Sequence, residues 1–369
     1  MRVYVLAPAY HYTGGVTALY QLCKALNDFG VISYIGFYDY SGKHSLVHPN
    51  YETYACPHVV LNDITDANTT TVIVPESRPD LLSRFRKAQK ILYWLSVDHF
   101  IRAHFYPSTL KFYFLKYLIN EFFVKFHNFL FDIFLFNYKQ SLRFYRNAFI
   151  ADFVKSVIEN KSIRIPHVDI HIVQSEYART FLIQNLVPKE RIVFLHEPLE
   201  SEFLSSSSVD DNRSNIIAWN VRKAYPIASR IILQLKRKGL QVVELENVGK
   251  HKLIKILKRS RIFIDIGIHP GRDRPPREAV VLGNITIVNN HGGCYFYDDC
   301  MIPTPFKIDC YSNKSCRLNV KEFIENLLNY LENYDYYYNR YFWKFKEFIK
   351  REPELYLREV ENLAKLIGR

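Results

Sequence analysis

The chain of 369 residues carries 49 lysines and arginines against 37 acidic residues, so its formal net charge is +12 at pH 7. This length exceeds what one hydrophobic core usually organises. A content of 48% hydrophobic and 23% charged residues excludes a mainly disordered chain. The positive charge indicates an anionic partner, for which nucleic acid, a membrane surface and a phosphorylated small molecule are the three alternatives.

Cysteine usage and the start of the chain favour a cytoplasmic protein. The six cysteines include no C-x-x-C pair, and their spacings do not fit a zinc knuckle. We therefore expect reduced thiols and no structural zinc. The opening run MRVYVLAPAYHYTGG is broken by a histidine and two glycines, which is not typical of a signal peptide.

Short apolar runs alternate with helical patterns in the first half of the chain. The run RVYVLAP predicts a strand, Gly14-Gly15 a tight loop, and residues 16–30 a helix that ends at Gly30. Further strands are predicted in VISYIGFYD, TTTVIVP, KILYWLSVD, DIHIVQS and RIVFLHEP. Continuous apolar runs of this kind are typical of parallel strands that are buried on both faces, so we expect a doubly wound sheet.

The polar run SEFLSSSSVDDNRSN at residues 201–215 predicts a domain boundary. After it the alternation restarts, with strands in NIIAWN, QVVELEN, IFIDIGI and ITIVNN and helical patterns between them. The prediction is an α/β fold with two Rossmann-like domains and a helical C-terminus. We expect an N-terminal domain over 1–205, a C-terminal domain over 206–345, and a C-terminal helix over 346–369 that packs back toward the N-terminal domain.

Residues 101–150 interrupt this scheme with 17 phenylalanines and tyrosines. Lysines and an aspartate interrupt this segment, so none of its uncharged stretches is long enough to cross a bilayer. We expect an amphipathic insertion that lies on an anionic membrane with its aromatic rings at the headgroups. The alternatives are packing on the first domain as a helical hairpin, and formation of a homodimer.

Two loops carry candidate binding residues. Gly14 and Gly15 allow close backbone approach, and the following helix start presents free N–H groups to a phosphate, although a turn without a ligand is the alternative. The second loop, DIGIHPGRDRPPREAVVLGN, follows a strand and is rich in arginines that suit a diphosphate, with a solvated charged loop as the alternative. Its candidate residues are His269, Gly271, Arg272, Asp273, Arg274, Arg277 and Glu278.

A third candidate is the pair Arg222-Lys223, directly after the first strand of the second domain. The carboxyl ends of parallel strands meet at one edge of a sheet, so this pair and the arginine loop are expected to face one ligand. The alternative is a pair of exposed basic residues at the start of a helix.

Taken in order, these segments resemble family 4 glycosyltransferases of the GT-B type. The resemblance rests on Gly14-Gly15, VQSEYAR, HEPL, Arg222-Lys223 and HPGRDRPPREAVVLGN followed by Gly292-Gly293. It implies two Rossmann-like domains with a cleft between them, a nucleotide-sugar donor on the C-terminal domain and an acceptor on the N-terminal domain. It also implies transfer that retains anomeric configuration and needs no metal or other cofactor.

The resemblance assigns roles to single residues. Arg222 and Lys223 would contact the diphosphate, and Glu278 would hold the ribose. Asp98 and His99, at the end of a predicted strand, would face the transferred sugar, with a structural role as the alternative for the histidine. Pro270 stands where the family has the first of two glutamates, and His269, Gly271 or Asp273 are the candidates to replace it.

The sequence therefore predicts a hexosyltransferase-like enzyme that is cytoplasmic, peripheral on the inner face of the membrane and active in surface polysaccharide assembly. Its partners would be a nucleoside-diphosphate sugar and a glycan or lipid-linked acceptor, and no nucleic acid. The alternatives are a GT-B nucleotide-sugar epimerase and a non-catalytic protein that binds membranes or nucleic acid.

Overall fold

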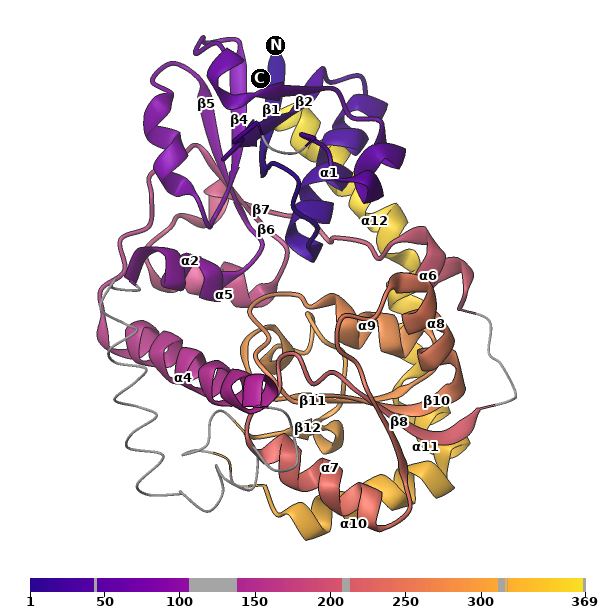
Figure 1. Ribbon diagram of the computed structural model, residues 1–369. Helices are drawn as coiled ribbons and strands as arrows, with labels where there is room; N and C mark the ends of the chain where they lie inside the picture. The colour runs from indigo at the N-terminus through magenta and orange to yellow at the C-terminus, as the bar shows by residue number, and fades with distance from the viewer. Residues whose placement is uncertain (43–44, 106–137, 208–212, 311–315, 317, 368–369) are drawn as a thin grey trace. The chain divides into compact units, whose positions relative to one another are not determined.

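The computed structural model describes residues 1–42, 45–105, 138–207, 213–310, 316 and 318–367. The chain forms two compact units (Figure 1). The first unit comprises residues 1–103, 162–198 and 351–369, and the second comprises residues 104–161 and 199–350. Each unit is described by itself below.

The first unit is built on a seven-stranded parallel sheet in the order β3-β2-β1-β4-β5-β6-β7. The order reverses direction beside β1, as in doubly wound folds. Its strands are β1 (Arg2–Pro8), β2 (Ser33–Tyr38), β3 (His58–Val60), β4 (Thr70–Pro75), β5 (Gln89–Trp94), β6 (Ile170–Val173) and β7 (Ile192–Phe194). Its helices are α1 (Gly14–Asp28), α2 (Val97–Phe105), α5 (Glu176–Gln184) and the end of α12 (Trp343–Ile367). Its 3-10 turns are η1 (Pro49–Tyr54), η2 (Leu61–Asp63), η3 (Pro79–Arg84) and η4 (Lys189–Arg191).

The central strands of this sheet are buried, as their apolar runs predict. Val3 and Val5 in β1 and Val72 and Ile73 in β4 are fully inaccessible to solvent. Helix α1 begins after its N-cap Thr13, and Gly30 follows it with φ +78°, a left-handed conformation that glycine adopts without a Cβ penalty. The predicted helix and its glycine stop are confirmed.

The second unit contains a five-stranded parallel sheet in the order β12-β11-β10-β8-β9. Its strands are β8 (Ser214–Trp219), β9 (Gln241–Glu244), β10 (Ser260–Asp265), β11 (Ile285–Asn289) and β12 (Lys307–Ile308). Its helices are α4 (Tyr138–Asn160), α6 (Ser201–Ser205), α7 (Ile227–Arg237), α8 (Lys250–Arg259), α9 (Arg274–Val281), α10 (Val320–Glu332), α11 (Tyr334–Tyr341) and the start of α12, with 3-10 turns η5 (Gly292–Tyr295) and η6 (Thr304–Phe306). The predicted α/β fold with two parallel sheets and a helical C-terminus is confirmed.

Helix α4 packs within the second unit, whereas the sequence pattern places residues 101–150 in the N-terminal domain. Phe144, Ala148 and Ala151 are buried in the hydrophobic core that contains Trp219. The side chain of Gln140 donates to Glu244 at 3.2 Å. Apolar side chains bury against whichever surface complements them, and chain order does not specify that surface. Most of the aromatic run, at residues 106–137, lies outside the described residues, so the membrane and dimer alternatives stay predictions.

The cysteines differ from expectation at one pair. Cys310 and Cys316 form a disulfide, so the prediction of six reduced thiols is wrong for these two. The other four cysteines are free.

Within the described ranges, no helix combines the length and the apolar character that crossing a bilayer requires.

Candidate functional site

The candidate site in the second unit lies where β8, β10 and β11 end. Asn220, directly after β8, donates from its side chain to Asp265 Oδ2 at 3.1 Å. Asn289, at the end of β11, donates to the carbonyl oxygen of Gly267 at 3.3 Å. These bonds join the three strand ends, so residues distant in sequence form one sheet edge.

Two glycines allow the loops at this edge to touch. A Cβ on Gly267 would overlap the backbone carbonyl of Lys223, and a Cβ on Gly293 would overlap that of Gly271. The Gly293 N–H also donates to the carbonyl oxygen of His269 at 2.9 Å. Any larger residue would therefore separate the arginine loop from its neighbours.

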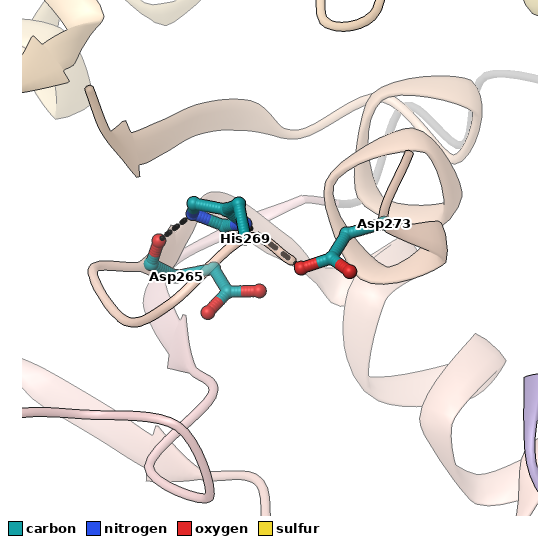
Figure 2. Close-up of side chains that lie close together, drawn as sticks. All are labelled: Asp265, His269 and Asp273. Carbon is teal, nitrogen blue, oxygen red and sulfur yellow. Dashed lines mark hydrogen bonds and ion pairs between the residues drawn. The ribbon is translucent and has the colours of Figure 1, made fainter. Parts of the chain in front are cut away.

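Asp273 is the centre of a charged cluster in which His269 is buried, while Lys223 and Asp273 itself are partly exposed. The Lys223 ammonium lies 2.6 Å from Asp273 Oδ2, and His269 Nδ1 lies 2.9 Å from the same oxygen. The Nε2–H of His269 donates to the carbonyl oxygen of Asp265 at 3.0 Å. Figure 2 shows the His269 ring between the two aspartates.

Two opposing effects set the pKa values in this cluster. Burial disfavours the charged form of each group, and the oppositely charged neighbours favour it. Burial alone would raise the pKa of Asp273, but the charge of Lys223 and the hydrogen bond from His269 lower it to about 2. Burial would lower the pKa of His269, yet its bond to Asp273 and the two aspartate charges raise it. The pKa of Lys223 is raised by Asp273 and Asp265 against its own burial. The cluster is therefore an ion-pair network whose cations are held in place.

The side-chain atoms of Asp265, His269 and Asp273 lie close enough together to hold a metal ion. However, the Lys223 ammonium already contacts the Asp273 carboxylate, and both ring nitrogens of His269 have partners. An ammonium at this place supplies the positive charge that a metal would bring and repels a second cation. The donor set therefore fits an ion-pair network better than a metal centre.

Arg222 differs from Lys223 because its side chain is exposed and makes no ion pair with the described residues. Its backbone is fixed by α4. The side chain of Asn147 donates to the carbonyl oxygens of Arg222 at 3.2 Å and Ala224 at 3.0 Å. The Arg222 side chain is therefore exposed to solvent on a loop at the end of β8 whose backbone is held by Asn147. Asn147 was not among the sequence candidates, because nothing in its local pattern indicates this contact.

The arginines of the loop after β10 are engaged within the second unit. Arg272 is 3% exposed, and its guanidinium lies 5.7 Å from the Phe348 ring centre. Arg277 is 1% exposed and donates to the carbonyl oxygens of Arg272 and Asp273. These two arginine side chains therefore stabilise the segment after β10.

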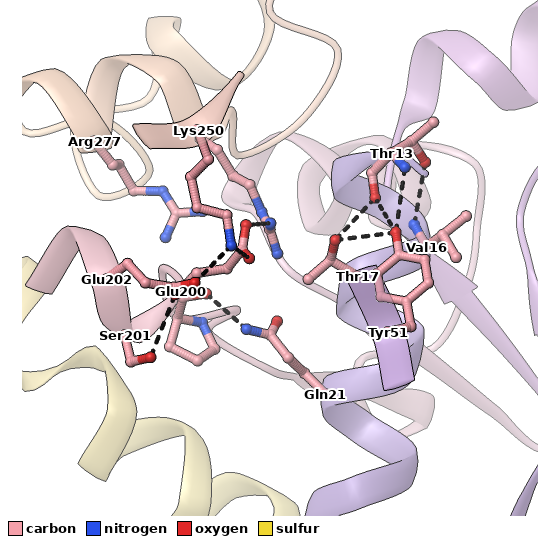
Figure 3. A network of polar contacts seen from close by, with 12 residues as sticks. Thr13, Val16, Thr17, Gln21, Tyr51, Glu200, Ser201, Glu202, Lys250 and Arg277 are labelled. Atoms are coloured by element: carbon pink, nitrogen blue, oxygen red, sulfur yellow. Dashed lines mark hydrogen bonds and ion pairs between the residues drawn. The ribbon is translucent and has the colours of Figure 1, made fainter. Parts of the chain in front are cut away.

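Arg274 belongs to a second ion-pair group, of which Figure 3 labels Glu200, Glu202 and Lys250. Arg274 lies 3.5 Å from Glu200, and Lys250 lies 2.5 Å from Glu200 and 2.8 Å from Glu202. Glu278, the proposed ribose ligand, is in α9 and is 8% exposed. Gly271 lies against Gly293, as described above, and Pro270 offers no side-chain donor or acceptor.

In the first unit, the loop after β1 is fixed by Tyr51. The Tyr51 hydroxyl donates to the carbonyl oxygen of Thr13 at 3.0 Å and accepts from the Thr13 N–H at 3.3 Å (Figure 3). Thr13 also caps α1 by accepting from the Val16 N–H at 3.3 Å. The predicted strand and helix are confirmed, but Gly14 and Gly15 form the first residues of α1 and not a loop before it, so the helix starts two residues earlier than predicted. A ligand of these glycines stays a prediction.

Asp98 and His99, in the first turn of α2, differ in exposure to solvent. Asp98 is 1% exposed and accepts from the Tyr177 hydroxyl at 3.1 Å. His99 is exposed, and its N–H donates to Ser96 Oγ at 3.1 Å. Of the two, only His99 is accessible to a ligand of the first unit.

Glu76, directly after β4, is a buried acid that was not among the sequence candidates. Its carboxylate accepts from the Leu95 N–H at 3.0 Å. Burial raises the pKa of Glu76 to about 8. The sequence did contain a sign of this residue, because Glu76 directly follows the apolar run TTVIVP. An acid in that position lies at the carboxyl ends of the strands, at the same edge of the sheet as Gly14.

Replacing Glu76 by glutamine should flatten the pH dependence of stability between about pH 4.5 and pH 8. The folded protein keeps this proton up to a pKa of about 8, whereas the unfolded chain releases it near 4.5. Wild-type stability should therefore fall by up to about 1.4 kcal/mol per pH unit across this window. Thermal unfolding across the same range measures the slope. Exposed Glu190→Gln is the control, and an unchanged slope in Glu76→Gln would contradict the assignment.

The sequence matches no protein-family model, and no curated protein matches it. Solved structures do match over nearly the whole chain. HepE from Anabaena, solved with UDP-glucose, has a TM-score of 0.54 at 10% identity and covers 99% of this chain and 100% of its own. A glycosyltransferase from Rickettsia africae has a TM-score of 0.51 at 13% identity, with 97% and 98% covered.

Sucrose-phosphate synthase from Thermosynechococcus elongatus matches with a TM-score of 0.50 at 9% identity, covering 100% of this chain and 97% of its own. At such identities the likeness establishes the fold. The chain therefore has the GT-B fold, as its resemblance to GT-B glycosyltransferases predicted.

Proposed function

We propose that this protein is a glycosyltransferase that moves a sugar from a nucleoside-diphosphate donor to a glycan or lipid-linked acceptor. The proposal is supported chiefly by the exposed Arg222 side chain at the end of β8, next to the partly exposed Lys223–Asp273 ion pair. Ligands of open α/β sheets bind at the carboxyl ends of the strands, which is where these residues lie. The GT-B fold supports the same conclusion.

The proposed chemistry is electrostatic stabilisation of the leaving group. As the sugar–phosphate bond breaks, negative charge develops on the diphosphate. Arg222 would donate two parallel hydrogen bonds to phosphate oxygens, while Lys223, held by Asp273, adds a fixed positive charge. Glu278 would accept hydrogen bonds from the ribose hydroxyls. Transfer with retained configuration follows from the resemblance to family 4.

A UDP-sugar is the first donor class to test, because HepE was solved with UDP-glucose. Addition of UDP at about 100 times its Kd should stabilise the folded protein by about 2.7 kcal/mol. A thermal-shift series with UDP, GDP, ADP and CDP measures this and identifies the base. No shift with any nucleoside diphosphate would refute the proposed donor site.

Catalysis without a metal is the second part of the proposal. Because Lys223 and His269 engage the Asp273 carboxylate of the only metal-like cluster among the described residues, transfer should be unchanged by EDTA. Release of UDP from a UDP-sugar, with and without EDTA, measures this. Loss of activity with EDTA and its recovery with Mg²⁺ or Mn²⁺ would contradict it.

The acceptor and the place of action are proposed from the sequence. We place the enzyme at the inner face of the cytoplasmic membrane in surface polysaccharide assembly, with those of residues 101–150 that are not buried in α2 and α4 in contact with anionic lipid. The epimerase alternative is separated by product analysis with donor alone, since an epimerase needs no acceptor.

A further inference from the structure

The amino-terminal edge of the first sheet contains a cavity of about 710 Å³. It lies at the opposite ends of the strands from Gly14 and Glu76, because all seven strands are parallel. Its lining comes from the loops that lead into β4, β5 and β6, together with Met1 and Ile367. The cavity is therefore formed within the first unit and is separate from the carboxyl-edge residues described above.

Positive charge dominates this cavity. Arg86, Lys87 and Lys90 line it, and none of the three makes an ion pair with the described residues. Elsewhere in the first unit, exposed lysines such as Lys24 and Lys365 pair with acids one helical turn away. Three unpaired cations around one concave surface create a local field that attracts an anion.

The acids near the cavity are already engaged with the backbone. Asp169, the one acid in the lining, accepts from the Lys90 N–H at 2.8 Å. Asp66 accepts from the N–H groups of Arg86, Lys87 and Ala88 at 2.8, 2.9 and 2.9 Å. These hydrogen bonds fix the loop before β5 and occupy its backbone N–H groups. A ligand in the cavity would therefore be bound by the basic side chains of this loop and not by its backbone.

A guanidinium and a histidine lie beside these cations. His167, also in the lining, lies 2.9 Å from the guanidinium of Arg191. Burial lowers the pKa of the neighbouring His171 to about 4, and the charges of Arg191 and His167 act in the same direction. Asn68 and Thr69 add neutral polar groups to the same wall.

We propose that this cavity binds a phosphate group. A guanidinium that forks onto two oxygens, two ammonium groups and neutral donors beside them match a phosphate mono- or diester. The group could belong to a soluble phosphate compound or to a phospholipid headgroup. This proposal does not depend on glycosyl transfer, because none of its residues belongs to the donor site.

The test is titration of the full chain with inorganic phosphate, followed by calorimetry. Arg222→Ala serves as the background, so that the proposed donor site contributes little. Lys87→Gln/Lys90→Gln should weaken phosphate binding about 10-fold or more, from the loss of two nearby charges. The matched control, Lys252→Gln/Lys255→Gln, removes two exposed lysines of α8 that likewise make no ion pair with the described residues, and should bind as the background does.

A second arm separates the two sources of phosphate. Vesicles of phosphatidylcholine with and without phosphatidylglycerol are sedimented with each variant. Binding that requires phosphatidylglycerol, is lost in Lys87→Gln/Lys90→Gln and is competed by phosphate assigns the site to lipid headgroups. Phosphate binding without vesicle binding assigns it to a soluble compound. If the double variant and the control bind phosphate and vesicles equally, the proposal is wrong, provided that their melting temperatures agree.

Discussion

Replacement of Arg222 by alanine should lower sugar transfer by about 10² to 10³-fold, the usual effect of removing one group that stabilises developing charge. The side chain is exposed and makes no ion pair with the described residues, so its loss should leave the melting temperature unchanged. Initial rates of UDP release and of product formation measure the effect. Arg222→Lys should recover part of the rate, because a lysine keeps the charge and loses the planar fork.

The matched control for Arg222→Ala is Arg230→Ala. Arg230 lies in α7 of the same unit, is also exposed, and makes no ion pair with the described residues. It has the same charge but does not lie at the end of β8, so its replacement should leave transfer unchanged. Equal activity of the two variants would remove Arg222 from the mechanism. Lys223→Ala is a less specific test, because it would also leave Asp273 without its cation.

Replacement of Gly293 by alanine should destabilise the second unit and abolish donor binding together. The new Cβ would overlap the backbone carbonyl of Gly271, which cannot move without displacing the arginine loop and His269. Overpacking against backbone costs about 1–3 kcal/mol, which corresponds to a melting temperature lower by about 2–12 °C for a unit of this size. Thermal unfolding with and without UDP measures both effects.

Gly249 offers the control for this substitution. It precedes α8 with φ −63°, and a Cβ there would meet nothing within 4 Å. Gly249→Ala should therefore cost about 1 kcal/mol or less, as a change at a helix N-cap, and should leave UDP binding intact. A Gly293→Ala variant as stable and as active as Gly249→Ala would show that the loops at this sheet edge do not need their close approach.

The short edge strands β3 and β12 are among the elements that the sequence patterns did not predict, as is α6, which lies in the polar run at 201–215. The two strands contain three and two residues, so they are too short to show an alternation or an apolar run. The long runs were found because a parallel strand covered on both faces needs apolar residues at nearly every position. The same runs located the strand ends, and with them Gly14, Arg222 and the loop from Asp265.

The candidate site shows the difference between composition and arrangement. In the sequence, the strongest indication of a diphosphate site was the group of three arginines at positions 272, 274 and 277. In the structure, Arg272 and Arg277 are buried in their own loop, while Arg222 remains exposed. Exposure depends on neighbours such as Phe348, which is far along the chain from these arginines.

The sequence by itself therefore determined the alternation of strands and helices, the two parallel sheets and the loops that carry charged residues. Local patterns suffice for these features, since each strand or helix repeats its own burial period. The tertiary structure alone decided that α4 braces Arg222 through Asn147, 75 residues away, and that Lys223, His269 and Asp273 form one network. It also brought the cations Arg86, Lys87 and Lys90 around one cavity, because contacts between distant segments depend on how whole surfaces fit together.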